Sequence, residues 1–237
     1  MQRLARFLFP PQCLCCDEFV NVDQGLCPAC WAETPFVSAH GCESCAEPLI
    51  GEVEKGDLCD SCRETPRPWK AGRAAFIYGD NARSLVLKFK HGDRTDLAPA
   101  LGAWLAEAAT PMIAPNMIVA PVPLHWKRGL QRQYNQALLL SQHVAKQRKL
   151  QHCPNLVQRH KATAQLDGMT AQERKDMVSG AITLRPKFES LIQGRPVLLI
   201  DDVMTTGATM TECANACLSG GAEHVYVSVL ARVAKRD

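Results

Sequence analysis

The stretch VLLIDDVMTTGATM, residues 197 to 210, runs from four aliphatic residues into two adjacent carboxylates and then into a small, hydroxyl-rich turn. An aliphatic run bounded by turn residues is typical of a strand buried in a parallel sheet. The turn predicts a helix from about Thr206. Ligands of open α/β sheets bind beyond the carboxyl ends of strands, and we expect residues 201 to 209 to form such a loop.

This loop offers two kinds of polar group, which suit different parts of one ligand. Amides at a helix N-terminus attract anions, and Gly207 lets the backbone approach closely. The phosphate contacts are expected from Met204, Thr205, Thr206, Gly207, Ala208 and Thr209. Asp201 and Asp202 would repel a phosphate, but they suit the vicinal hydroxyls of a ribose or the water shell of Mg²⁺. Together they predict a ribose 5-phosphate, the alternative being a strand that merely ends in a polar turn.

The rest of residues 71 to 237 alternates between strand and helix patterns. Strands are expected at 74–79, 117–123, 181–184, 196–201 and 224–231, and helices at 81–89, 96–109, about 130–148 and after 206. This alternation predicts an α/β domain with a mainly parallel sheet covered by helices on both faces.

The first seventy residues have a different composition. Nine of the twelve cysteines lie before residue 63, and a proline-rich junction follows at Pro66 and Pro68. Four Cys-x-x-Cys pairs occur, at Cys13 and Cys16, Cys27 and Cys30, Cys42 and Cys45, and Cys59 and Cys62. We therefore expect a cysteine-rich domain at 1–70, followed by the α/β domain at 71–237.

Each Cys-x-x-Cys pair can supply two thiolates to a tetrahedral metal ion, so the pairs predict two structural Zn²⁺ sites of the zinc-ribbon type. Which pairs share an ion stays open, because ribbons can interleave. A redox dithiol is the alternative for a single pair, but four pairs with few aliphatic residues between them favour zinc. Metal binding would then supply the folding free energy of this segment.

Charge divides the chain at the same place. Residues 1–70 carry a net charge of −5 and residues 71–237 a net charge of +8, while the whole chain carries +3. Residues 121–175 contain ten Lys and Arg against two acidic residues, a pattern that attracts phosphates. The sequence has neither a long apolar run nor a signal peptide, so we expect a cytoplasmic protein with no membrane span.

Residues 197–209 resemble the signature for 5-phosphoribosyl 1-pyrophosphate (PRPP) in the type I phosphoribosyltransferases. The resemblance implies that fold for the C-terminal domain, Mg²⁺ bound together with PRPP, and Asp201 and Asp202 as catalytic residues. In this fold the loop after an earlier strand holds the pyrophosphate. That loop contains Lys127 and Arg128 here, which could otherwise be solvated surface residues.

Two further segments narrow the resemblance. PVPLHWKRGLQRQYNQA (121–137) and RHKATAQLDGMTAQERKDMVSGAI (159–182) are similar to the corresponding runs of the ComF/GntX family, as is LVLKFKHGD (85–93). Gln133, Tyr134, Met177 and Ile182 depart from the family pattern, and Gln165 stands one place early. The resemblance covers nearly the whole chain and implies a zinc-ribbon and phosphoribosyltransferase-like competence protein, active in DNA uptake by natural transformation.

Three functions remain open. The basic segment could track single-stranded DNA, although its charges could instead serve PRPP alone. The protein could transfer ribose 5-phosphate from PRPP to a base, or sense PRPP and pass the signal to DNA or to other competence or DNA-processing proteins. The candidates for a lid or a DNA contact are Arg132, Tyr134, Arg159, Lys161 and Arg174.

Overall fold

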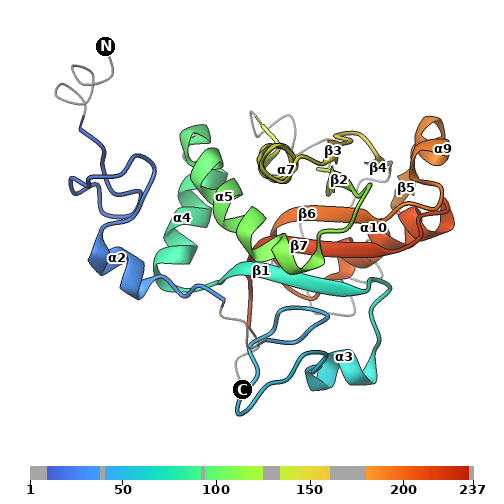
Figure 1. The fold of residues 1–237 in the computed structure, drawn as a ribbon, viewed down its shortest axis with the longest axis horizontal. Helices are drawn as coiled ribbons and strands as arrows, with labels where there is room; N and C mark the ends of the chain where they lie inside the picture. The colour runs from blue at the N-terminus through green and yellow to red at the C-terminus, as the bar shows by residue number, and fades with distance from the viewer. Residues whose placement is uncertain (1–9, 38–40, 92–93, 125–133, 161–179, 235–237) are drawn as a thin grey trace.

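The computed structural model describes residues 10–37, 41–91, 94–124, 134–160 and 180–234. Its centre is a five-stranded sheet of order β1-β7-β6-β2-β3, in which every neighbouring pair is parallel (Figure 1). The strands are β1 (Ala71–Ile77), β2 (Ile118–Pro121), β3 (Gln151–His152), β6 (Val197–Met204) and β7 (Val225–Arg232). The predicted α/β class with a mainly parallel sheet is confirmed.

Helices cover both faces of this sheet. The helices are α4 (Asp80–His91), α5 (Ala98–Ala109), α7 (Gln136–Arg148) and α10 (Ala208–Ser219). The first three pack on one face with Leu198 and Ile200, while α10 packs on the other with Leu199. The alternation along β6 follows from the period of two residues in a strand. Cys213 and Cys217 of α10 are fully buried core residues.

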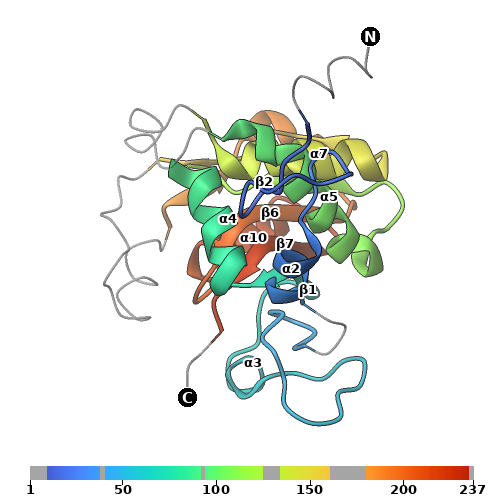
Figure 2. The ribbon, with the colours of Figure 1, turned by 90° about the vertical axis from the view of Figure 1, so that its left-hand side faces the viewer.

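Short elements complete the fold. They are α2 (Pro28–Glu33), α3 (Asp60–Glu64), η1 (Thr95–Leu97), η2 (Thr110–Met112), β4 (Val157–Arg159), β5 (Ile182–Leu184), η3 (Pro186–Phe188) and α9 (Glu189–Ile192). α2 follows Cys27 beside α4, and α3 follows Cys59 on the opposite side of β1 (Figures 1 and 2). None of the helices in the described part of the chain combines the length and apolarity that crossing a bilayer requires.

Several predicted boundaries are wrong. The run at 181–184 does not join the main sheet, because β5 pairs antiparallel with β4 in a separate two-stranded sheet. β3 and β4 were missed because two or three residues are too short to show periodicity. The first strand begins at Ala71 rather than residue 74.

The stretch that decides the fold is also arranged differently from the prediction. β6 continues through both aspartates to Met204, because β7 pairs with it as far as Met204 opposite Arg232. The helix begins at Ala208 rather than about Thr206, since Gly207 has a φ of 81°, which is not helical. The connecting loop is therefore only residues 205–207, and the acids lie on the end of the strand.

Candidate functional site

The two aspartates at the end of β6 have unlike environments. Burial first, and then repulsion by Asp202, raises the pKa of the Asp201 carboxyl to about 7. The Asp202 amide donates a hydrogen bond of 2.8 Å to Oδ1 of Asp201. A carboxyl with a raised pKa beside a second acid is suited to a site where a cation or ligand hydroxyls supply the missing partners.

Lys90 supplies a positive charge beside these acids. Its Nζ lies 3.1 Å from Oδ2 of Asp202, and both side chains are less than one-fifth exposed. Lys90 stands near the end of α4, where the Tyr134 hydroxyl donates to the Phe89 carbonyl at 2.6 Å and Gln136 donates to the Lys90 carbonyl at 3.3 Å. Sequence reasoning missed this residue as a site residue, although it lies within LVLKFKHGD, one of the segments that carry the family resemblance.

The loop after β6 leads directly into a helix through a glycine. Gly207 takes the left-handed conformation that favours glycine and stands as the N-cap of the twelve-residue helix α10. The Ala208 amide donates to the Thr206 hydroxyl at 3.4 Å. Thr205 is exposed, and Thr209 is half-buried on the first turn. The loop thus brings hydroxyl groups and the positive end of a helix dipole next to the carboxyl end of β6.

The remaining candidates fall into two groups. Arg159 ends β4, and its positive charge is one of the smaller influences that act to lower the pKa of Asp201. Tyr134 packs its ring on Phe89 with a centroid distance of 6.0 Å, so it has a structural role whether or not it also stacks a base. The candidates outside the described residues are Lys127, Arg128, Arg132, Lys161 and Arg174.

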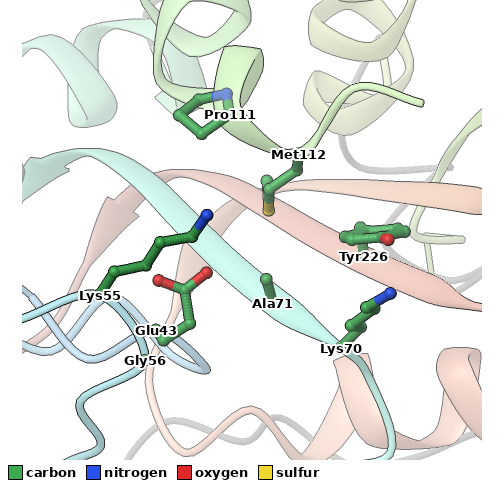
Figure 3. A pocket seen from close by; sticks show the side chains of 8 residues that line it. All are labelled: Glu43, Lys55, Gly56, Lys70, Ala71, Pro111, Met112 and Tyr226. Atoms are coloured by element: carbon green, nitrogen blue, oxygen red, sulfur yellow. The ribbon is translucent and has the colours of Figure 1, made fainter.

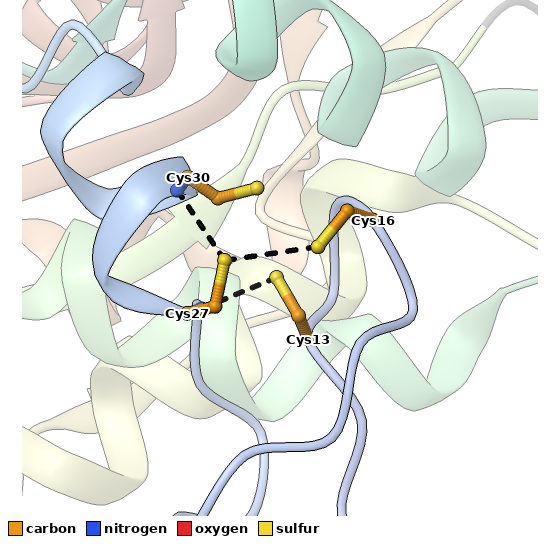
Figure 4. Close-up of side chains that lie close together, drawn as sticks. All are labelled: Cys13, Cys16, Cys27 and Cys30. Atoms are coloured by element: carbon orange, nitrogen blue, oxygen red, sulfur yellow. Dashed lines mark hydrogen bonds between the residues drawn. The ribbon is translucent and has the colours of Figure 1, made fainter.

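The eight paired cysteines form two tetrads. One comprises Cys13, Cys16, Cys27 and Cys30 and is called the first tetrad (Figure 4); the other comprises Cys42, Cys45, Cys59 and Cys62 and is called the second tetrad. Within each, the sulfur atoms all lie within 4.8 Å of one another. Consecutive pairs therefore share a site, and the interleaved arrangement that the sequence left open is excluded.

The sulfur spacing fits zinc. A tetrahedral ion with Zn–S bonds of about 2.3 Å requires sulfur atoms about 3.8 Å apart. The sulfurs of Cys16 and Cys27 are 3.7 Å apart, and those of Cys45 and Cys59 are 3.6 Å apart. Hydrogen bonding from Cys45 lowers the pKa of Cys42 to about 4, although burial opposes the shift. Both tetrads fit a structural zinc ion.

A separate cavity of about 460 Å³ lies near the amino ends of β1 and β7 (Figure 3). Its lining residues are Glu43, Lys55, Gly56, Lys70, Ala71, Pro111, Met112 and Tyr226. Ala71 and Tyr226 lie at the amino ends of β1 and β7, so this cavity is remote from the acids at the carboxyl end of β6. Within this cavity, the Glu43 carboxylate forms an ion pair with Arg73, whose Nη2 lies 2.8 Å from Oε2.

Comparison with known proteins agrees with the geometry of the N-terminal segment. The model of the double zinc ribbon domain matches residues 4–63, which contain both tetrads. The fold and sites define a class of protein in which a double zinc ribbon precedes a parallel α/β sheet whose central strand ends in two adjacent acids.

Comparison of the whole chain gives the family. "DNA utilization protein YhgH" of Escherichia coli (strain K12) is 30% identical over 230 residues, covering 93% of this chain and 89% of that protein. "Competence protein F" of Haemophilus influenzae is 28% identical over 228 residues, covering 93% of this chain and 96% of that protein. This chain belongs to the ComF/GntX family, together with these proteins.

Solved structures were also compared. The glutamine PRPP amidotransferase from B. subtilis, complexed with ADP and GMP, aligns with a TM-score of 0.41 and 12% identity. The alignment covers 61% of this chain and 30% of that one.

Proposed function

We propose that this protein is a cytoplasmic competence protein that binds Mg²⁺·PRPP and handles single-stranded DNA during natural transformation. The observation that carries the proposal is the meeting of three features at the carboxyl end of β6: the carboxylates of Asp201 and Asp202, the ammonium of Lys90, and the start of α10. Each feature matches one part of a sugar phosphate.

The ligand is oriented by the order of these features along the chain. Its 5-phosphate lies at Thr206, Gly207 and the first turn of α10, where backbone amides and hydroxyl groups can donate hydrogen bonds to the phosphate oxygens. The ribose hydroxyls face the acids of β6. Asp201 and Asp202 would hold Mg²⁺ through its water shell, and the ion would supply neutralising charge beside the ligand. Lys90 is then released from Asp202 to meet the ligand's negative charge.

The DNA part of the proposal is supported by charge and by the relatives. Residues 121–175 carry a net charge of +8, more than one PRPP needs. Relatives of nearly full length are named "Competence protein F" and "DNA utilization protein YhgH". Arg132, Tyr134, Arg159, Lys161 and Arg174 are proposed as lid or DNA contacts, and Lys127 and Arg128 as pyrophosphate contacts. Other competence or DNA-processing proteins are the proposed protein partners.

Transfer of ribose 5-phosphate to an acceptor is a second candidate. The observation that favours it is the raised pKa of Asp201, about 7, because such a carboxyl can exchange a proton near neutral pH. Release of pyrophosphate from Mg²⁺·PRPP in the presence of candidate bases, faster in the native protein than in Asp201→Ala, would support turnover. Equal rates would restrict the protein to binding.

Titration calorimetry with Mg²⁺·PRPP tests the binding site. The double variant Asp201→Ala/Asp202→Ala is expected to lose the binding heat. The matched control removes two exposed acids, Glu189→Ala/Glu223→Ala, and is expected to bind as the native protein does. Native protein that gives no heat, or an aspartate variant that binds normally, overturns the proposed pocket.

Binding of labelled single-stranded DNA at several salt concentrations tests the second half of the proposal. The logarithm of the affinity should fall linearly with that of the salt concentration, with a slope of several units. A flat salt dependence, or no binding at low salt, would remove DNA handling and leave PRPP binding standing.

A further inference from the structure

The second tetrad lies against the α/β domain through three consecutive carbonyl groups. The Glu43 carbonyl accepts from the Gly72 amide at 2.9 Å. The Ser44 carbonyl accepts from Nε1 of Trp69 at 2.6 Å, and the Cys45 carbonyl accepts from Nε of Arg232 at 3.1 Å. The backbone that carries Cys42 and Cys45 is therefore held by side chains and amides from outside the ribbon.

Arg232 also holds the loop after β6, together with Arg67, through the carbonyls of that loop. Nη1 of Arg232 donates to the Met204 carbonyl at 3.2 Å and to the Thr205 carbonyl at 2.6 Å. Nη1 of Arg67 donates to the Thr206 carbonyl at 3.0 Å. Arg232 therefore connects the loop at residues 205–207, called the phosphate loop below after its proposed ligand, to the Cys42–Cys45 turn, called the knuckle.

Arg232 is the principal connection. Its side chain is 4% exposed, and the guanidinium spans from Cys45 to Thr205 while its Nη2 pairs with Glu47, itself 8% exposed. A planar guanidinium can hold several acceptors at fixed angles, which an ammonium cannot do. A charge this buried requires all of its partners in place, so moving the knuckle acts directly on the loop.

Trp69 provides a second connection by packing. Gly207 is buried, and a Cβ atom built at this position would lie 3.3 Å from the Trp69 ring, while the Arg67 guanidinium lies 5.7 Å from the ring centroid. Trp69 therefore touches the residue whose left-handed conformation starts α10, and it also bonds to Ser44. The contact gives the knuckle a second route to the same loop.

We propose that Arg232 is a positioning residue that holds the phosphate loop in its ligand-binding shape, and that metal in the second tetrad sets the position of Arg232. This inference rests on the proposed function, because it names what controls PRPP affinity at that site. Loss of the ion would free the Cys42–Cys45 backbone and withdraw the Cys45 and Glu47 partners. The guanidinium would then keep only its bonds to the Met204, Thr205 and Val233 carbonyls. Small shifts of such a loop are sufficient to weaken binding strongly.

Arg232→Lys tests the connection because it keeps the positive charge but loses the planar guanidinium that bonds to several acceptors at once. The expected result is Mg²⁺·PRPP affinity lower by about tenfold or more, with two zinc ions per chain retained. The control is Lys88→Met, which cuts the equivalent bonds to the first tetrad at the Leu14 and Cys15 carbonyls. It should bind PRPP within about twofold of the native affinity.

Hydrogen exchange gives a readout that does not depend on PRPP. Amides of residues 204–211 should exchange faster in Arg232→Lys than in the native protein, and in Lys88→Met they should not. Unchanged exchange together with unchanged affinity in Arg232→Lys overturns the inference. Native protein that fails to bind PRPP defeats the proposed function instead, while the exchange comparison still decides whether Arg232 positions the loop.

Discussion

The two cysteine tetrads have the same ligands and spacing of sulfur atoms but different surroundings. The first tetrad meets α4, where Lys88 donates to the Cys15 carbonyl at 2.8 Å and Asn81 donates to the Cys30 carbonyl at 3.2 Å. The second tetrad meets Trp69 and Arg232, which also contact the loop after β6. One zinc site thus braces a helix, and the other braces the candidate ligand site.

Aromatic packing reinforces the difference. Trp31 of α2 lies 4.4 Å from Phe36 and 6.4 Å from Trp104, measured between ring centroids, and Phe36 packs on Phe76 of β1 at 5.1 Å. The first ribbon is therefore attached by aromatic packing as well as by hydrogen bonds to α4 and β1, none of which reaches the loop after β6. The second is attached by hydrogen bonds and a buried ion pair of Arg232, which also holds that loop. The same metal chemistry can therefore serve stability in one place and geometry in another.

The largest expected effect comes from removing one tetrad at a time. Cys42→Ser/Cys45→Ser should lose one zinc ion and weaken Mg²⁺·PRPP binding by about a thousandfold or more, since both routes to the loop are lost. Cys13→Ser/Cys16→Ser should also lose one zinc ion but keep the affinity within about threefold. Zinc content by mass spectrometry and calorimetry on the same samples measure both quantities. Equal losses of affinity in the two variants would contradict the claim that only the second tetrad supports the candidate ligand site.

Trp104→Ala tests the apolar attachment of the first ribbon. Because Trp104 packs on Phe36 and Phe76 with centroid distances of 5.8 Å and 5.7 Å, its loss should lower the free energy of unfolding by about 3 kcal/mol. PRPP affinity should be unchanged wherever the protein is folded. Urea unfolding gives the free energy, and a fall in affinity at temperatures well below the transition would contradict the assignment.

Part of the pH dependence of stability should originate from Asp201, near the end of β6. The pKa of Asp201 rises on folding from 3.8 to about 7, so between those values the folded state binds a proton that the unfolded state has released. This contribution is fully present below about pH 4 and is lost as the pH rises through about 7. Asp201→Asn should therefore stabilise the ligand-free protein by about 4 kcal/mol at pH 8 and leave it nearly unchanged at pH 4. Urea midpoints at both pH values measure this, and equal effects at the two would exclude the ionisation as cause.

The smallest effect is expected from Trp69→Phe, which separates the two contacts of this residue. The bond to the Ser44 carbonyl is lost, but a ring still lies against Gly207. Affinity for Mg²⁺·PRPP should fall by about threefold, close to the effect of one hydrogen bond. A drop as large as that of Arg232→Lys would show that Trp69, rather than Arg232, is the main connection.

Local pattern was sufficient to predict much of this molecule. The buried run before Asp201 predicted the central strand, and the Cys-x-x-Cys spacing predicted both metal sites, because each signal lies within about twenty residues. The glycine at 207 was expected for close backbone approach and takes a left-handed conformation. The roles proposed for Asp201, Asp202 and the threonines stay predictions until ligand binding is measured.

The residues that sequence reasoning missed act over long separations. Lys90 reaches Asp202, and Arg232 reaches Cys45 across 187 positions of the chain. A lysine in a helix and an arginine near a basic tail both look like surface residues, and only the packing of strands shows that Arg232 is buried. The pairing of β4 with β5 was missed for a related reason, since their short runs have no period of their own.

The place of β7 has a consequence for the order in which the protein matures. β7 lies between β1 and β6 in the sheet, although it is the last of these strands in the chain. During synthesis on the ribosome, the Cys-x-x-Cys pairs emerge early and can bind their ions before β7 has joined the sheet. The loop after β6 lacks its hydrogen bonds from Arg232 until that late residue has been synthesised, so a nascent chain can load its metals before this loop is fully held.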